Sequence, residues 1–192
     1  MEPLHGTVAS LFLGAAGTLS KSARSSLEFA FDGIVGDRHR GQTRKAWEHT
    51  DKQPGGTERR NERQWSAVAQ EDLDQASLLL SLIKPLNAGD VAVNLSIGGI
   101  PDFSRLPRGT ILTFESGVVL MVEEYNPPCS RMSQYVSEGH EATTGVALGE
   151  ADFIEASKFS RGLVGVVEVP GVVSVGEGVL AAPEVLPKWL RA

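Results

Sequence analysis

The 192-residue sequence contains one cysteine, Cys129, which excludes an internal disulfide bond. So little cysteine fits a reducing compartment, because small secreted domains are usually held together by disulfides. Residues 1–5 lack the basic and apolar regions of a secretory signal peptide. No stretch approaches the roughly 18 apolar residues of a membrane span. We therefore expect a cytoplasmic protein that does not contact a membrane.

Several common binding signatures are also missing. The formal net charge is −6, so a general affinity for nucleic acid is not expected. Aromatic residues make up only 6% of the chain and offer no obvious platform on which a purine would stack. His39, His49 and His140 are too scattered for a zinc site. The chain has no P-loop, and residues 33–41 lack the third glycine of a dinucleotide-binding loop.

The length and composition are those of one globular domain. Apolar residues make up 41% of the chain and charged residues 22%, as in ordinary globular proteins. A chain of 192 residues is long enough to bury a core without disulfides or metals. We therefore interpret residues 1–192 as a single domain.

Positive charge is concentrated between residues 38 and 63. This segment holds eight of the 18 Lys and Arg residues and only four acidic residues, so its formal charge is +4 and that of the rest is −10. The basic residues are Arg38, Arg40, Arg44, Lys45, Lys52, Arg59, Arg60 and Arg63. Residues 42–64 are polar and contain Pro54-Gly55-Gly56, which predicts a long loop on a β body. Either the loop binds an anionic ligand or a dedicated partner, or its charges simply keep it solvated.

Most of the remaining sequence predicts short strands. They fall at residues 27–31, 91–97, 110–114, 118–125, 162–169 and 172–175. Ser116-Gly117 predicts a hairpin that joins the third and fourth of these strands. Pro170-Gly171 predicts a second hairpin that joins the last two.

Two helices complete the expected fold. One starts at Ser66 or Gln70, runs to residue 82 and is stopped by Lys84-Pro85, and a second, short helix follows Cys129. Residues 183–192 are expected to form a terminal strap whose Trp189 and Leu190 pack on the body. Many short strands with glycine turns indicate a mainly β (α+β) domain, and a closed or partly closed barrel would avoid exposed sheet edges.

Cys129 lies in the sequence Pro127-Pro128-Cys129-Ser130-Arg131. The two prolines suppress helix before the cysteine, and the following residues can start one. A thiol at a helix N-terminus beside an arginine is favoured as thiolate, the nucleophilic and metal-binding form. A lone cysteine is also often an inert apolar side chain. The residues alone leave both interpretations open.

A second cluster, residues 33–41, places three glycines around Asp37, Arg38, His39 and Arg40. Glycines permit tight turns and close approach of the backbone to a ligand. Asp37 is suited to hold the imidazole of His39 in one tautomer, although it could equally stabilise the turn. A thiol hydrolase that pairs Cys129 with His39 is conceivable, but no local protease signature supports it.

Asn94 lies within an apolar stretch, where its amide needs hydrogen-bond partners. Those partners are either the backbone of a loop or a ligand, and the residues do not choose between them.

Taken together and in this order, Gly36-Asp37-Arg38-His39-x-Gly41, Asn94-Leu95-x-x-x-Gly98 and Pro128-Cys129 resemble the MOSC domain, the C-terminal domain of molybdenum-cofactor sulfurases. Similar domains also occur as free-standing bacterial proteins. The resemblance covers nearly the whole chain. It implies a compact β-barrel-like fold and a role in molybdenum-cofactor or sulfur chemistry.

The resemblance also implies roles for individual residues. The cysteine that corresponds to Cys129 is proposed in the family to carry sulfur as a persulfide or to ligate molybdenum. The candidate catalytic residues of this chain are Cys129, His39 and Asp37, and the candidate metal ligand is Cys129. The molybdenum cofactor (molybdopterin) carries a phosphate, which basic residues would bind. The candidate cofactor contacts are Arg38, Arg59, Arg60, Arg63, Asn94, Arg131 and Arg161.

Two functions follow from the resemblance. The first is a molybdenum enzyme that reduces N-hydroxylated compounds, served by a redox partner, and the second is a sulfur carrier loaded by a cysteine desulfurase. Cofactor sulfurases fuse this domain to a desulfurase half that holds pyridoxal phosphate, so no pyridoxal phosphate is expected in this chain. Amidoxime-reducing relatives carry an additional N-terminal barrel that this chain is too short to contain. A structural domain with an inert thiol is the third interpretation.

Overall fold

The computed structural model describes residues 3–48 and 50–185. Within them the strands are β1 (Leu4–Leu13), β2 (Ser22–Arg24), β3 (Ser26–Ala30), β4 (Gly33–Ile34), β5 (Thr43–Lys45), β6 (Glu58–Arg60), β7 (Trp65–Ala69), β8 (Leu95–Gly98), β9 (Ile111–Phe114), β10 (Val119–Tyr125), β11 (Leu163–Val169), β12 (Gly171–Ser174) and β13 (Gly178–Ala182). The helices are α1 (Gln70–Leu79), α2 (Ser130–Gly139) and α3 (Asp152–Ala156), with a short 3-10 helix at Phe103–Arg105. The chain is therefore mainly β, as the sequence predicts.

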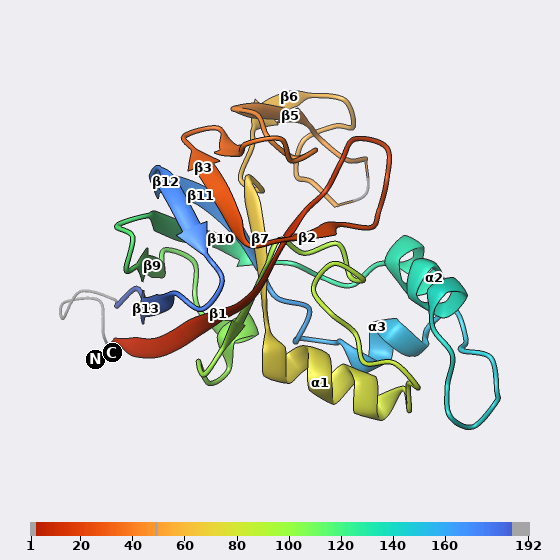
Figure 1. The fold of residues 1–192 in the computed structure, drawn as a ribbon. Helices are drawn as coiled ribbons and strands as arrows, with labels where there is room; N and C mark the ends of the chain where they lie inside the picture. The colour runs from red at the N-terminus through yellow and green to blue at the C-terminus, as the bar shows by residue number, and fades with distance from the viewer. Residues whose placement is uncertain (1–2, 49, 186–192) are drawn as a thin grey trace, which may run out of the picture.

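Seven strands form a closed barrel (Figure 1). Their order is β13-β9-β10-β11-β7-β8-β1, and β1 pairs with β13 to close the ring. Neighbouring strands are antiparallel except β7 and β8, which run parallel and are connected through α1. Closure removes the exposed sheet edges that would otherwise template aggregation, and the expectation of a closed barrel is confirmed.

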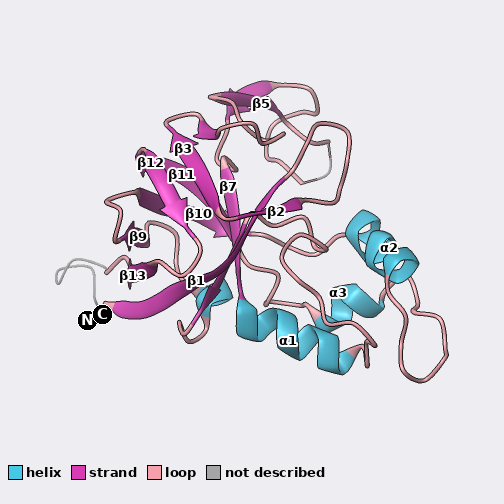
Figure 2. Cartoon of the chain, in the orientation of Figure 1, coloured by secondary structure: helices cyan, strands magenta, loops and turns pink. Residues whose placement is uncertain are grey.

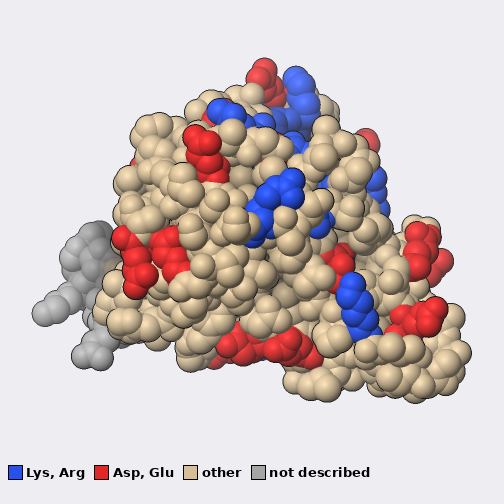
Figure 3. All heavy atoms as spheres, in the orientation of Figure 1, with Lys and Arg blue, Asp and Glu red and all other residues tan. Residues whose placement is uncertain are grey.

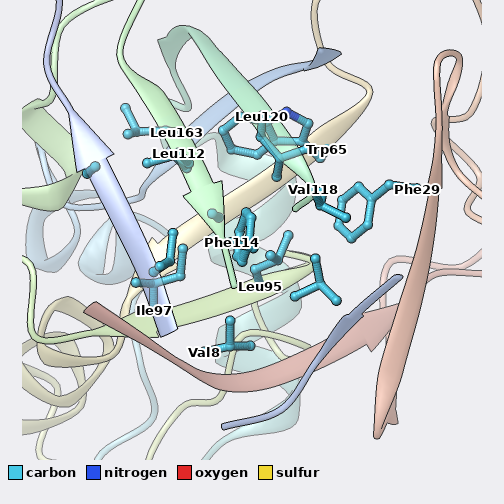
Figure 4. Close-up of a cluster of buried hydrophobic side chains, with 14 of the residues drawn as sticks. Val8, Phe29, Trp65, Leu95, Ile97, Leu112, Phe114, Val118, Leu120 and Leu163 are labelled. Carbon is cyan, nitrogen blue, oxygen red and sulfur yellow. The ribbon is translucent and has the colours of Figure 1, made fainter. Parts of the chain in front are cut away.

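The barrel interior is filled by large apolar side chains from every wall (Figure 4). Trp65 is fully buried, and its indole Nε1 donates a hydrogen bond to the carbonyl oxygen of Val166 (2.9 Å), so its one polar atom is satisfied. Phe114, Leu120 and Leu95 fill the space beside it. This packing fixes the strand ends from which the loops of the site emerge.

A three-stranded sheet, in the order β12-β3-β4, lies beside the barrel, and β5 pairs with β6 in a separate hairpin. The segment at residues 42–64 thus contains a short β-hairpin within the expected loop. The predicted hairpin at Pro170-Gly171 is wrong. The two strands exist, but β12 pairs with β3 rather than with β11, because the chain leaves the barrel at Pro170.

The three α-helices lie together on one side of the barrel (Figure 2). α3 packs against both α1 and α2. α1 begins at Gln70, which is one of the two predicted starts. It ends at Leu79, earlier than the predicted end near Lys84-Pro85. Ser81 has a φ of 52° and turns the chain out of the helix. Of the helices that the structure describes, none is both long and apolar enough to cross a membrane.

Several strands agree with the sequence prediction and others do not. β3, β9, β10, β11 and the β9–β10 hairpin are confirmed. The strand predicted at 91–97 begins only at Leu95, while β1, β7 and β13 were not predicted. Most of the expected C-terminal strap, including Trp189 and Leu190, lies outside the described residues.

Gly165 offers a test of the packing between β10, β11 and β7. A Cβ atom there would overlap the carbonyl oxygen of Met121 and the ring of Trp65. We expect Gly165→Ala to lower the free energy of unfolding by at least about 1–3 kcal/mol, because neither the backbone nor the buried ring can move away freely. Urea denaturation followed by circular dichroism measures the change. Gly139→Ala is the control, since a Cβ there meets no atom within 4 Å, and it should be close to neutral. Equal effects of the two substitutions would contradict the packing described.

Candidate functional site

Cys129 is the N-cap residue of α2. Its backbone is extended (φ −133°, ψ 160°), and its carbonyl oxygen accepts the first hydrogen bond of the helix from the amide of Ser133 (2.9 Å). Its side chain is a free thiol at the surface. The expected helix after Cys129 is therefore confirmed, and the thiol is accessible to a ligand or to another protein.

Arg161 is buried, with only 7% of its surface exposed, and lies within electrostatic range of Cys129. Its Nη2 donates a hydrogen bond to the carbonyl oxygen of Val91 (2.6 Å), while Nε and Nη1 have no partner among the described residues. Burial lowers the pKa of Arg161 to about 10, which a negative charge on Cys129 would counteract. A buried cation with two unused donors is unfavourable unless an anion meets it. The arrangement is thus suited to an anionic group beside the thiol.

Arg38 and Arg131 add two further positive charges to the surroundings of Arg161 and Cys129. Arg38 is half-buried, and burial lowers its pKa, an effect that the charge of Arg131 reinforces. Arg131 is exposed in the first turn of α2. In the part of the chain that the structure describes, neither guanidinium forms an ion pair or a hydrogen bond. Arg38, Arg131 and Arg161 thus leave charge available for an anion.

The other arginines of the basic segment are occupied by the protein itself. Arg59 pairs with Asp51 and Glu62, and Arg60 with Glu123. Lys and Arg side chains gather over the upper part of the face drawn in Figure 3, around the β5–β6 hairpin. These ion pairs neutralise part of that charge and fasten the hairpin to β10.

Arg63 connects the same segment to the loop before the cysteine. Its Nη2 donates to Oδ1 of Asn126 (2.6 Å), and its Nη1 lies 3.2 Å from Oε1 of Glu124. Burial lowers the pKa of Arg63, although Glu124 opposes this. Because Asn126 lies three residues before Cys129, Arg63 helps to fix the loop that presents the thiol.

Asp37 is buried and accepts hydrogen bonds from segments that are far apart in the sequence. Its Oδ2 accepts hydrogen bonds from the amide of Gly14 (3.0 Å), from Lys21 Nζ (2.9 Å) and from Asn94 Nδ2 (2.7 Å). Its Oδ1 accepts one from the amide of His39 (3.0 Å). Burial acts to raise the pKa of Asp37, but hydrogen bonds from His39 and the charge of Lys21 outweigh it and hold that pKa well below its usual range. Asp37 is therefore ionised at any ordinary pH.

His39 is oriented by this carboxylate, since its Nδ1 lies 3.3 Å from Oδ1 of Asp37. Burial lowers the pKa of His39 more than the hydrogen bond to Asp37 raises it, so the imidazole is neutral at pH 7. The side chain remains 39% exposed. The structure thus brings Asp37 and His39 together, and Nε2 of the ring forms no hydrogen bond with the described residues.

Asn94 is buried, and its side chain is engaged by the protein. Besides the bond to Asp37, its Nδ2 donates to the carbonyl oxygen of Phe12 (3.1 Å), and its Oδ1 accepts from the hydroxyl of Ser66 (2.9 Å). Asn94 thus links β1, through Phe12, and β7, through Ser66, to the carboxylate of Asp37.

Lys21 was missed by the sequence analysis, although it is the charged partner of Asp37. Its side chain is fully buried, and burial lowers its pKa to about 8 against the opposing charge of Asp37. It follows Leu19 and Ser20 in a polar stretch. The residue types around Lys21 therefore give no indication that its side chain is buried.

A bare metal ion finds no ready site in residues 3–48 and 50–185, where no three His, Cys, Asp or Glu side chains converge. A metal that arrives with its own organic ligands would need only one protein ligand. One free thiol beside unpaired arginines fits such an anionic metal cofactor better than it fits a free ion.

The buried pair of Lys21 and Asp37 can be tested by Asp37→Asn. We expect a loss of about 3–5 kcal/mol in the free energy of unfolding at pH 7, because Lys21 would be left buried without its counter-charge. The low pKa of Asp37 stabilises the folded state above the unfolded value of about 4 and does so less as the pH falls below it. The difference in the free energy of unfolding between the wild type and Asp37→Asn should therefore become smaller as the pH falls below about 4.

Urea denaturation between pH 7 and pH 3 measures both effects. Asp32→Asn, which removes an exposed pair with Arg40, is the control and should cost no more than about 1 kcal/mol. A loss for Asp37→Asn no larger than that of the control would contradict the role of this carboxylate.

Known proteins share this architecture. The family model described as MOSC domain matches residues 37–180. "Putative metal-sulfur cluster biosynthesis proteins YuaD" from Bacillus subtilis (strain 168) is 31% identical over 151 residues, which cover 79% of this chain and 77% of YuaD. The crystal structure of the Bacillus subtilis YuaD protein superimposes with a TM-score of 0.87 at 25% identity, over 95% of this chain and 98% of YuaD.

More distant likeness extends to YiiM from Geobacillus stearothermophilus, with a TM-score of 0.63 at 14% identity over 92% of this chain and 75% of YiiM. At this identity the likeness shows the fold alone. The family model, in contrast, spans Asp37, His39, Asn94, Cys129 and Arg161. The resemblance recognised in the sequence is thereby confirmed, and the chain belongs to the MOSC family.

Proposed function

We propose that this protein binds the molybdenum cofactor at Cys129 and supports reduction of N-hydroxylated compounds. The observation that carries the proposal is Arg161, a buried guanidinium beside the thiol with two donors unused. An anionic cofactor would supply the missing acceptors and the metal that a soft thiolate prefers.

Each residue of the site has a part in this proposal. Cys129 would ligate the metal, while Arg161, Arg38 and Arg131 would bind the anionic parts of the cofactor. His39, held neutral by burial and oriented by Asp37, would offer Nε2 as a proton donor or acceptor near the substrate. When bound, molybdenum supplies two-electron oxygen-transfer chemistry, and a separate redox protein would provide the electrons.

The remaining candidate residues have a supporting place in the proposal. Arg59, Arg60 and Arg63 are held by acidic or amide partners, and the side chain of Asn94 is satisfied by protein atoms. We assign them to positioning the loops around the site.

Metal content tests the proposal directly. After expression in a host that makes the molybdenum cofactor, the protein should contain molybdenum, and oxidation of the preparation should release the fluorescent pterin. Cys129→Ala should abolish the molybdenum content. Arg161→Lys should reduce it severalfold, because lysine keeps the charge but lacks the planar set of donors.

Arg105→Lys is the matched control, since this exposed arginine pairs with Asp102 and belongs to the short Phe103–Arg105 helix, and its metal content should equal that of the wild type. Molybdenum that is absent from the wild type, or unchanged by Cys129→Ala, would refute cofactor binding at the thiol.

A second function is favoured by the exposure of Cys129. A surface thiol is open to another protein, as sulfur transfer requires, and the name of YuaD points to metal-sulfur cluster biosynthesis. In this alternative the Cys129 thiolate attacks the outer sulfur of a desulfurase persulfide. The new S–S bond forms as the old one breaks, and the desulfurase thiolate leaves.

Incubation with a cysteine desulfurase and cysteine distinguishes this function. Mass spectrometry should find one added sulfur atom on the peptide that contains Cys129, and the addition should disappear on treatment with a reductant. Arg161→Lys should slow the addition, because it weakens the stabilisation of a persulfide anion. Lack of an adduct under conditions that load a known sulfur carrier would eliminate the alternative.

A further inference from the structure

An apolar groove lies on the helical side of the molecule, apart from the site just described. It is a cavity of about 430 Å³ between the end of α1, residues 142–148 and α3, and it is called here the α1–α3 groove. Leu79, Val146 and Leu148 are among the side chains that line it. Figure 1 shows these segments together, on the side of the barrel that also carries α2.

The apolar side chains at this groove are unusually exposed. Leu79 is 60% exposed and Val146 is 69% exposed, and the adjoining Leu78 and Ile83 are 73% and 62% exposed. Single exposed apolar residues are ordinary, but a group of them around a groove marks a surface that another molecule covers.

The charge of the groove indicates what kind of molecule fits it. Asp152 and Glu155 line it, and no Lys or Arg does so. Glu155 forms no ion pair with any described residue, and Glu141 and Glu150 are exposed at either end of the 142–148 segment. Apolar walls with acidic rims are complementary to an apolar segment flanked by Lys or Arg.

We propose that the α1–α3 groove is the docking site for a basic amphipathic helix of a partner protein. The apolar face of the helix would fill the groove between Leu79 and Val146, and its Lys or Arg side chains would pair with Glu155 and Asp152. A helix laid into an apolar groove is a recurrent mode of recognition. An anionic membrane surface would be repelled by the same carboxylates.

A second copy of this chain fits the groove less well. α1 and α3 contain no Lys or Arg, and α2 contains only Arg131. The exposed cations among the described residues are dispersed. Lys45, Lys52 and Arg60 lie on or between β5 and β6, whereas others, such as Lys84, Arg108 and Lys158, lie on separate loops and turns. Among residues 3–48 and 50–185, no helix therefore has the required combination of apolar and basic side chains.

The position of the groove indicates the task of the partner. The 142–148 wall follows α2, whose ten residues span about 15 Å from Cys129 at its start. A protein held in the groove would lie within reach of the thiol. If the proposed function holds, that partner delivers electrons or sulfur to Cys129, but the docking itself does not depend on what the thiol binds.

Two synthetic helices of about 15 residues with identical leucines, one with lysine and one with glutamate on the polar face, test the proposal. Fluorescence anisotropy with the full chain should show saturable binding of the Leu-Lys peptide and little binding of the Leu-Glu peptide. Val146→Ser and Glu155→Lys should each weaken the binding roughly tenfold, since the first removes an apolar contact without adding charge and the second reverses a charge.

Phe31→Ser is the control, because Phe31 is also apolar and 61% exposed but belongs to the turn between β3 and β4. It should leave binding unchanged, and circular dichroism should show that all three variants are folded. The proposal is overturned if the Leu-Lys peptide does not bind, if both peptides bind alike, or if neither groove variant weakens binding. Self-association or binding to anionic vesicles that Val146→Ser abolishes would instead assign the groove to a second copy or to a membrane.

Discussion

The buried carboxylate of Asp37 holds together the end of the barrel on which the site depends. It accepts hydrogen bonds from the chain just after β1, from Lys21 before β2 and from Asn94 before β8. These three segments converge because a buried charge must be surrounded by donors. The same carboxylate orients His39. One ionised group therefore holds the three segments together and also positions the imidazole.

The arginines of the chain divide into two groups that composition cannot distinguish. Arg59, Arg60 and Arg63 are held by carboxylates or by Asn126, and they fasten the β5–β6 hairpin and the cysteine loop to the barrel. Arg161 has a single backbone partner and two unused donors, while Arg38 and Arg131 leave their guanidinium groups unpaired within the described residues. The total charge of the basic segment is therefore a poor guide to its affinity. The cations available to a ligand are those the protein has not already paired.

The sequence predicts the fold well where apolar periodicity is strong and poorly where burial comes from long-range contacts. The nearly continuous apolar stretch of β10 and the helix after Pro127-Pro128 are clear from residue types alone. β1 was not predicted, because its first half is mixed in polarity and becomes a strand through pairing with β13 and β8. The partners of Arg60 and Arg63 lie about 60 residues further along the chain, at Glu123 and Asn126, so no local pattern reveals them. Lys21 is buried against Asp37, which lies 16 residues further along the chain, so no local pattern reveals this burial.

The pairing of β1 with β13 has a consequence for biosynthesis. Leu4 lies opposite Ala181, so the ring joins nearly the first residues of the chain to nearly the last described ones. A chain emerging from the ribosome would carry β1 with one edge unpaired until β13 follows, and contacts between such distant segments form slowly. The edge of β1 therefore stays open to other chains until β13, the last strand of the ring, is in place.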